Sequence, residues 1–218
     1  MLKYERVVPE GVEDGAPLVV LLHGRGADRF DLLGLAPHLP PGAVVVTPEA
    51  PHPGSEWGYG PGWAWYRYLG GTTPEAESFE ASQRALADFL AELPGLLPVR
   101  TGPLVLGGFS QGGTMSLGHA LRSPGTVPLV LNLSGFFPDH PTVRATPETV
   151  AGTRFFWGHG TMDPAIPFHF AVEGRAALAA AGAALEARDY EMGHGIDAAE
   201  ARDVRAWIER GLGAAGGA

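Results

Sequence analysis

Short apolar runs alternate along this chain with segments in which apolar residues recur every three or four positions. The runs are typical of strands that are buried on both faces, and the periodic segments are typical of helices with one apolar side. Six such strands are expected, at residues 17–23, 43–47, 103–109, 127–133, 154–158 and 185–190, with an edge strand at residues 7–9. This alternation predicts an α/β fold, a mainly parallel, doubly wound sheet with helices on both faces.

The expected helices carry start and stop signals. One should begin at Thr73 as its N-cap, with Pro74 at the first helical position. The last should begin at Asp197, where Glu200 completes a capping-box pattern, and should end at Gly211. Two further helices are expected over residues 111–121 and 168–181.

Length and composition indicate one globular domain over residues 1–218. Within it, residues 211–218 offer little to pack and are expected to fray. The first ten residues lack the apolar core of a secretory signal, and no apolar run approaches the length of a membrane span. We therefore expect a cytoplasmic protein without stable membrane insertion.

Charge and cysteine content exclude several kinds of function. The formal net charge of −9 argues against nucleic acid and anionic membrane surfaces as partners. The chain has no cysteine, which excludes disulfides, thiolate catalysis and cysteine-based metal sites. His38, His52, His140 and His169 show no metal-ligand spacing with one another, so no metal site is expected.

Residues 50–71 follow neither periodicity and are rich in glycine, proline and aromatic residues. A long irregular segment after a strand is a typical place for a pocket wall. The alternative is a small aromatic core that holds a long loop together. The pocket-wall interpretation predicts substrate contacts from Trp57, Trp63, Trp65 and Tyr66.

A candidate nucleophile follows the strand at residues 103–109. Ser110 stands between Gly108 and Gly112, where the strand should turn sharply into a helix and present the hydroxyl at the edge of the sheet. The Gly-x-Ser-x-Gly pattern alone is weak evidence in a chain with 32 glycines. Its position between a strand and a helix makes it informative.

A serine nucleophile needs a base and an acid that orients the base. In this fold the chain order is serine, acid, histidine, each on a loop after a strand. Asp163 and His194 supply that order, with Asp163 as the orienting carboxylate and His194 as the base. Asp139 is an alternative acid after an earlier strand, and Glu191 is close to His194 in sequence but would have to reach around its own loop.

The oxyanion of the tetrahedral intermediate needs fixed N–H donors. The backbone N–H groups of Gln111 and Arg25 are the candidates, and the Arg25 side chain should point to solvent or to the mouth of the site. His23 has two interpretations: it could contact substrate, but it more commonly braces such a loop.

These motifs resemble the phospholipase/carboxylesterase family of α/β-hydrolases, which includes acyl-protein thioesterases and lysophospholipases. The resemblance covers about residues 18–208 and implies the triad and oxyanion hole assigned above. Eukaryotic thioesterases of this family usually show Trp-Phe-Asp where this chain has Trp65-Tyr66-Arg67, which favours small-molecule esters over acyl-proteins. The matching blocks are Leu22-His23-Gly24-x-Gly26, Ala50-Pro51 followed by Trp65-Tyr66, Gly108-Phe109-Ser110-Gln111-Gly112-Gly113, Gly158-His159-Gly160-x-x-Asp163-Pro164-x-Ile166-Pro167 and Gly193-His194.

The resemblance implies a cofactor-independent serine carboxylesterase that hydrolyses small esters through an acyl-enzyme, with a homodimer as a family-based expectation. A lysophospholipase, an acyl thioesterase, and an amidase or peptidase on the same fold are alternatives that share the triad. A binding module on a hydrolase fold is a further alternative, but such proteins typically lack a triad member.

Overall fold

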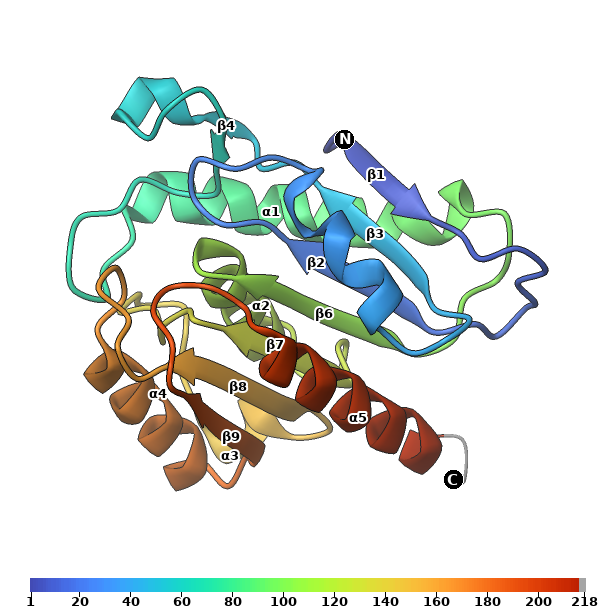
Figure 1. The fold of residues 1–218 in the computed structure, drawn as a ribbon. Helices are drawn as coiled ribbons and strands as arrows, with labels where there is room; N and C mark the ends of the chain where they lie inside the picture. The colour runs from blue at the N-terminus through green and yellow to red at the C-terminus, as the bar shows by residue number, and fades with distance from the viewer. Residues whose placement is uncertain (216–218) are drawn as a thin grey trace.

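The computed structural model describes residues 1–215, which form a seven-stranded sheet with the order β1-β3-β2-β6-β7-β8-β9 (Figure 1). Strand β1 runs antiparallel to β3, and every other neighbouring pair in this sheet is parallel. The mainly parallel sheet predicted from the sequence is therefore confirmed. Its strands are β1 (Tyr4–Val7), β2 (Leu18–Leu22), β3 (Val44–Pro48), β6 (Leu104–Phe109), β7 (Leu129–Leu133), β8 (Arg154–Gly160) and β9 (Ala184–Tyr190).

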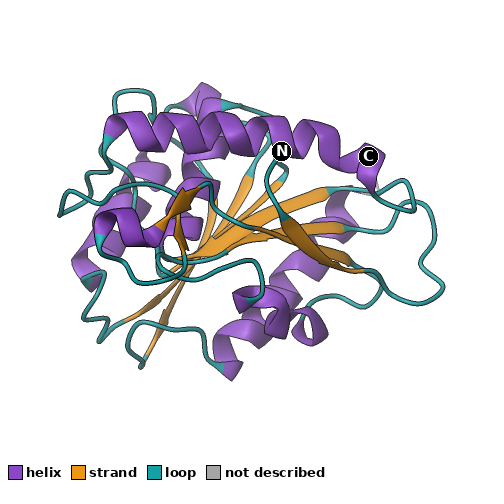
Figure 2. Ribbon diagram, turned by 90° about the horizontal axis from the view of Figure 1, so that it is seen from above, coloured by secondary structure: helices purple, strands orange, loops and turns teal. Residues whose placement is uncertain are grey.

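Helices cover both faces of the sheet (Figure 2). One face packs against α1 (Ala76–Glu92), α2 (Gln111–Arg122), α3 (Pro147–Val150) and α4 (Phe168–Ala180). The other face packs against η1 (Asp31–His38) and α5 (Ala198–Ala215). Because β2, β3 and β7 are buried along their whole length, their continuous apolar runs are explained by contacts on both faces.

Three element boundaries differ from the sequence predictions. The edge strand lies at Tyr4–Val7 and not at residues 7–9, because Tyr4–Val7 pairs with β3 and Pro9 has no N–H to extend that pairing. Helix α1 begins at Ala76 with Glu75 in the N-cap position, because Pro74 forms a bridge with Tyr68 instead of starting the helix. Thr73 therefore belongs to a turn.

Helix α5 continues through Gly211 to Ala215, where the sequence predicted an end. A Cβ on Gly211 would lie 2.7 Å from the Leu129 side chain, so the glycine lets the helix approach β7 closely and does not stop it. Residues 211–215 are helical and not frayed, and the prediction for residues 216–218 lies outside the described part of the chain. The N-cap at Asp197 is confirmed, because its Oδ1 accepts the N–H of Glu200 at 2.8 Å.

Residues 50–71 contain a small hairpin of β4 (His52–Pro53) and β5 (Trp63–Ala64), with the turn η2 (Gly54–Trp57) between them. This hairpin projects beside the carboxyl ends of the central strands (Figure 1). Two hydrogen bonds tie it to the loop after β2: the N–H of Gly26 donates to the Trp63 carbonyl at 2.8 Å, and the N–H of Trp63 donates to the Ala27 carbonyl at 2.7 Å. The hairpin is therefore fixed against the loop after β2, at the end of the sheet where the site residues gather.

Candidate active site

Ser110 occupies a strained turn between β6 and α2. Its φ of 55° and ψ of −116° are unusual for a residue other than glycine. The turn is possible because helix α2 lies against β2: a Cβ on Gly112 would overlap the carbonyl oxygen of Leu22, and one on Gly108 would overlap Gly112. The two glycines of the motif thus allow the close packing that aims the serine out of the sheet edge.

Ser110, His194 and Asp163 form one chain of hydrogen bonds. His194 Nε2 lies 3.0 Å from Ser110 Oγ, and His194 Nδ1 lies 2.6 Å from Asp163 Oδ2. Since an ionised carboxylate only accepts, Nδ1 carries the proton and Nε2 is free to accept the serine hydroxyl. The three residues come from loops after β6, β8 and β9, whose carboxyl ends share one edge of the parallel sheet.

Asp163 is held in place by its own loop. Its side chain is fully buried, and its Oδ1 accepts the backbone N–H groups of Ala165 and Ile166, each at 2.8 Å. His159 is also buried and bonds the Ile166 carbonyl through Nε2 at 2.9 Å, while burial lowers the pKa of its imidazole. A neutral His159 therefore supports the Asp163 loop without adding charge beside the carboxylate.

The two alternative acids lie elsewhere. Asp139 belongs to a separate small cavity lined by Phe137, Arg144 and Glu173 among others, and its backbone N–H donates to Thr72. Glu191 is exposed to solvent. Neither forms a hydrogen bond or an ion pair with His194 within the described residues, whereas Asp163 does.

The two predicted oxyanion donors lie beside the serine. Gln111 follows Ser110 at the first position of α2, and a Cβ built on Gly24 would lie 3.6 Å from the Ser110 Cβ, so the peptide between Gly24 and Arg25 passes next to the nucleophile. Within residues 1–215, no acceptor bonds the backbone N–H of Gln111 or of Arg25. Both are available to an oxyanion.

The Gln111 side chain joins the serine turn to the aromatic segment. Its Oε1 accepts the Trp65 N–H at 3.0 Å and its Nε2 donates to the Tyr66 carbonyl at 2.8 Å. The Trp65 indole N–H in turn donates to the His23 carbonyl at 2.9 Å. These bonds fix the serine turn, the loop after β2 and the segment after β5 relative to one another.

His23 braces its loop and does not line the pocket. The ring is almost completely buried, its Nε2 accepts the Ala50 N–H at 3.0 Å, and its Nδ1 therefore carries the proton that donates to the Gly24 carbonyl at 2.7 Å. Burial lowers the pKa of this imidazole. Of its two interpretations, the structure favours the brace.

A cavity of about 280 Å³ opens at Ser110 and His194. The aromatic segment contributes Tyr66 and Tyr68 to its wall, while the loop after β7 contributes Phe136. The Tyr66 hydroxyl is buried and has no hydrogen-bond partner among the described residues. The remaining lining residues are Gly24, Arg25, Ala27, Asp31, Phe109, Gln111, Ala165 and Ile166.

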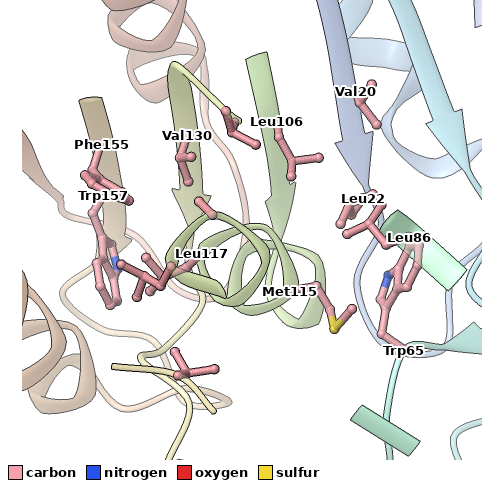
Figure 3. Packing of buried hydrophobic residues seen from close by; sticks show 14 of the residues in the cluster. Val20, Leu22, Trp65, Leu86, Leu106, Met115, Leu117, Val130, Phe155 and Trp157 are labelled. Carbon is pink, nitrogen blue, oxygen red and sulfur yellow. The ribbon is translucent and has the colours of Figure 1, made fainter. Parts of the chain in front are cut away.

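The three tryptophans predicted as pocket residues lie outside this cavity. Trp65 is fully buried in the core beside Leu22 and Leu86 (Figure 3). Trp57 stacks near His52, with ring centroids 4.9 Å apart, and Trp63 lies under the Lys3 ammonium. The aromatic segment is therefore partly the small core that was the alternative interpretation.

Phe136, Asp31 and Ile166 were not anticipated as pocket residues. Ile166 stands in the quoted His-Gly-x-x-Asp block, and Phe136 lies three residues after the buried strand β7, so position at the sheet edge was the available signal. Among the described residues, no group of three or more histidine or acidic side chains could hold a metal ion. No helix of the described chain is long and apolar enough to cross a membrane.

Comparison with known proteins gives consistent results. A sequence model of the phospholipase/carboxylesterase family matches residues 3–211. The chain is 28% identical over 181 residues to acyl-protein thioesterase 1 of Cryptococcus neoformans, covering 78% of this chain and 74% of that protein. It is 33% identical over 107 residues to carboxylesterase SOBER1 of Arabidopsis thaliana, which covers 48% of this chain and 47% of the relative.

Solved structures share the fold. Esterase PE8 superposes with a TM-score of 0.79 at 26% identity, covering 96% of this chain and 98% of its own. The carboxylesterase of Bacillus cereus superposes with a TM-score of 0.81 at 21% identity, covering 97% and 95%. With an α/β-hydrolase fold and a family match along nearly the whole length, the chain belongs to the phospholipase/carboxylesterase family, whose related members here are esterases and thioesterases.

Proposed function

We propose that this protein is a serine carboxylesterase that hydrolyses small carboxylic esters through an acyl-enzyme. The observation that carries the proposal is the chain of hydrogen bonds from Asp163 through His194 to Ser110, at the mouth of a cavity of about 280 Å³. A cavity of this size suits a small ester better than a long acyl chain.

In the first half of the reaction, Ser110 Oγ attacks the carbonyl carbon while His194 Nε2 takes the hydroxyl proton. The oxyanion accepts hydrogen bonds from the backbone N–H groups of Gln111 and Arg25, each worth roughly 3 kcal/mol to the transition state. Asp163 stabilises the imidazolium, which then gives its proton to the departing alcohol. The carbon–oxygen bond to the alcohol breaks and the acyl group remains on Ser110.

The second half repeats these steps with water. His194 takes a proton from water, the resulting hydroxide attacks the acyl carbon, and the same N–H groups bind the second oxyanion. The bond to Ser110 Oγ breaks as His194 returns the proton to it, and the free acid leaves. No cofactor enters these steps.

The direct test is hydrolysis of p-nitrophenyl esters from acetate to palmitate by the wild type and Ser110→Ala. We expect activity that peaks at short chains and falls by roughly 10⁴- to 10⁶-fold in the variant. Ser116→Ala is the matched control, because Ser116 is buried in the same helix, bonds the Gly112 carbonyl and does not contact His194. A folded wild type that neither hydrolyses any ester nor reacts with a fluorophosphonate at Ser110 would contradict the proposal.

An acyl thioester is the second candidate substrate, because the Cryptococcus relative aligned over 78% of this chain is named a thioesterase. Release of free thiol from an acyl-coenzyme A can be followed with a thiol reagent without background, since the chain has no cysteine. Faster release from the thioester than from the matched oxygen ester would reverse the order of the two candidates. Lysophospholipids and amides belong in the same substrate panel.

Two further expectations from the sequence stay predictions. A homodimer would be detected by light scattering of the purified chain. A cytoplasmic location would be detected by fractionation of the source cells.

A further inference from the structure

Arg25 places an unneutralised positive charge at the mouth of the cavity. Its backbone passes beside Ser110, its side chain is exposed, and the residue lines the cavity together with Tyr68 and His194. Within the described residues, its guanidinium forms no ion pair and no hydrogen bond, although several other arginines of the chain do. Arg29, for example, pairs with Glu5 at 2.9 Å and with Glu49 at 2.5 Å.

Two tyrosine rings of the aromatic segment hold the guanidinium in position. Its central carbon lies 4.8 Å from the centroid of the Tyr59 ring and 5.8 Å from that of Tyr68. The Tyr59 ring is itself fixed, because its hydroxyl accepts the backbone N–H of Tyr68 at 2.8 Å. Stacking on aromatic faces leaves the edge of a guanidinium, with its N–H donors, free to bind another group.

The loop that carries Arg25 is fixed against the same segment. A Cβ on Gly26 would lie 2.5 Å from the Tyr59 carbonyl oxygen, and the Gly26 φ of 79° is in the left-handed region that favours glycine. Trp63 bonds this loop on both sides through the Gly26 N–H and the Ala27 carbonyl. The side chain is thus positioned before any ligand arrives, which lowers the entropy lost on binding.

Asp31 also lines the cavity and carries the opposite charge. It does not neutralise Arg25, since no ion pair joins them. Asp31 begins η1, whereas Arg25 belongs to the preceding loop. The net charge of the whole chain is −9, so the long-range field repels anions. An anionic substrate would therefore have to be attracted locally, and the unpaired Arg25 beside the nucleophile can supply that attraction.

We propose that Arg25 binds an anionic oxygen group of the substrate, a carboxylate or a phosphate, so that this enzyme prefers esters that carry a negative charge near the scissile bond. The planar fork of a guanidinium matches the two oxygens of such a group. This inference rests on the proposed esterase function and adds the class of substrate to it.

The test compares esters that differ in charge and are similar in size. One pair varies the acyl side: mono-p-nitrophenyl glutarate against p-nitrophenyl valerate. A second pair varies the alcohol side: 4-acetoxybenzoate against its methyl ester. The readout is the ratio of kcat/KM for the anionic ester to that for the neutral ester, measured for wild type, Arg25→Met and Arg25→Lys. Because the Arg25 backbone is a proposed oxyanion donor, the ratio cancels any general loss of activity in these variants.

We expect the wild type to prefer the anionic member of at least one pair, and Arg25→Met to lower that ratio by about ten- to hundredfold. Arg25→Lys should keep part of the preference, since it retains the charge without the planar fork. Arg67→Gln is the control for net charge: Arg67 is exposed, pairs only with Glu75 at 3.5 Å and should leave the ratio unchanged.

The possible outcomes distinguish failure of the Arg25 proposal from failure of the proposed esterase function. Hydrolysis of all four esters with the same ratio in wild type and Arg25→Met would overturn the role of Arg25 and leave the esterase intact. A preference lost equally in Arg67→Gln would assign it to overall charge and would likewise overturn the role. Absence of hydrolysis together with an unlabelled Ser110 would overturn both proposals.

Discussion

The two sides of the cavity are built in different ways. On the triad side, residues 161–167 and 191–197 hold the site through side-chain hydrogen bonds, above all those of Asp163. On the aromatic side, residues 23–27 and 54–68 are joined through backbone bonds, ring contacts and glycines that allow close approach. Replacing a single hydrogen-bonding atom on the triad side should therefore impair catalysis. Substitutions on the aromatic side should mainly change stability and substrate preference.

The largest effect should come from Asp163→Asn. The asparagine oxygen can keep the bonds to the Ala165 and Ile166 N–H groups, so the fold should persist. Its NH₂ group would face His194 Nδ1 and favour the wrong tautomer, and kcat should fall by about 10⁴-fold. Steady-state kinetics and circular dichroism separate the two effects.

Asp139→Asn is the control for the Asp163 substitution, because Asp139 was the alternative acid and lies in a different cavity. It should leave kcat within a few-fold of the wild type. A large loss in Asp139→Asn with a small loss in Asp163→Asn would reverse the assignment of the acid.

Gln111→Leu tests the connection between the two sides. It removes the hydrogen bonds to the Trp65 N–H and the Tyr66 carbonyl in a buried place, with an expected loss of about 2–5 kcal/mol in the free energy of unfolding. Urea denaturation measures that loss. Activity should also fall, because the backbone of the same residue is a proposed oxyanion donor.

Gln83→Leu is the matched comparison for Gln111→Leu. Gln83 is equally buried and its Nε2 donates to the Met115 carbonyl at 3.0 Å, but it has no contact with the serine turn. It should lower stability and largely keep kcat. If both variants lost activity in proportion to stability, Gln111 would have no special role at the site.

Gly62→Ala is a smaller change confined to the aromatic side. Its Cβ would overlap the carbonyl oxygen of Gly26, so the hairpin must move away from the loop that carries Arg25. We expect a loss of about 1–3 kcal/mol in stability. That loss lowers Tm by roughly 2–4 °C per kcal/mol in a chain of this size. Gly95→Ala has open space around its Cβ and should change Tm little; equal shifts in both would show that the contact is unimportant.

The same comparison explains how far the sequence could predict this molecule. Ser110, Asp163 and His194 were found because each follows its own strand, so local pattern and sheet topology were sufficient to bring them to one edge. The tryptophans of residues 50–71, predicted to contact substrate, lie outside the cavity at Ser110. Periodicity cannot show which side of an irregular segment faces the core. Trp65 is buried through bonds to His23 and Gln111, which are 42 and 46 residues away.

Helix ends show the same limit. Asp197 acts as an N-cap through bonds within four residues, and the pattern found it. Gly211 was predicted to end the helix, but its role is to allow close packing against Leu129, which is distant in sequence. The second half of the predicted capping box also fails, because the Glu200 carboxyl turns into the interior instead of back to the helix start.

The smallest expected effect comes from Glu200, which should change how the stability of the protein depends on pH. Its side chain is fully buried behind the triad side, against Gly158 of β8, and neither carboxyl oxygen has a hydrogen-bond partner among the described residues. Burial, helped by the nearby charges of Asp197 and Asp203 and partly offset by Arg175, raises the pKa of this carboxyl to about 8. The folded protein therefore holds a proton that the unfolded chain releases near pH 4.5.

Because the folded state binds more protons between about pH 4.5 and pH 8, this carboxyl makes the protein less stable as pH rises through that window. The slope is at most about 1.4 kcal/mol per pH unit. Glu200→Gln keeps the shape of the side chain and removes the titration. From pH 5 to pH 8, the unfolding free energy of the wild type should therefore fall relative to that of the variant. Glu209→Gln, half exposed on the same helix, is the control for the loss of one carboxylate from α5. A constant difference for Glu200→Gln across this range would contradict the prediction and would mean that the carboxyl finds a partner in the folded protein and does not titrate between pH 5 and pH 8.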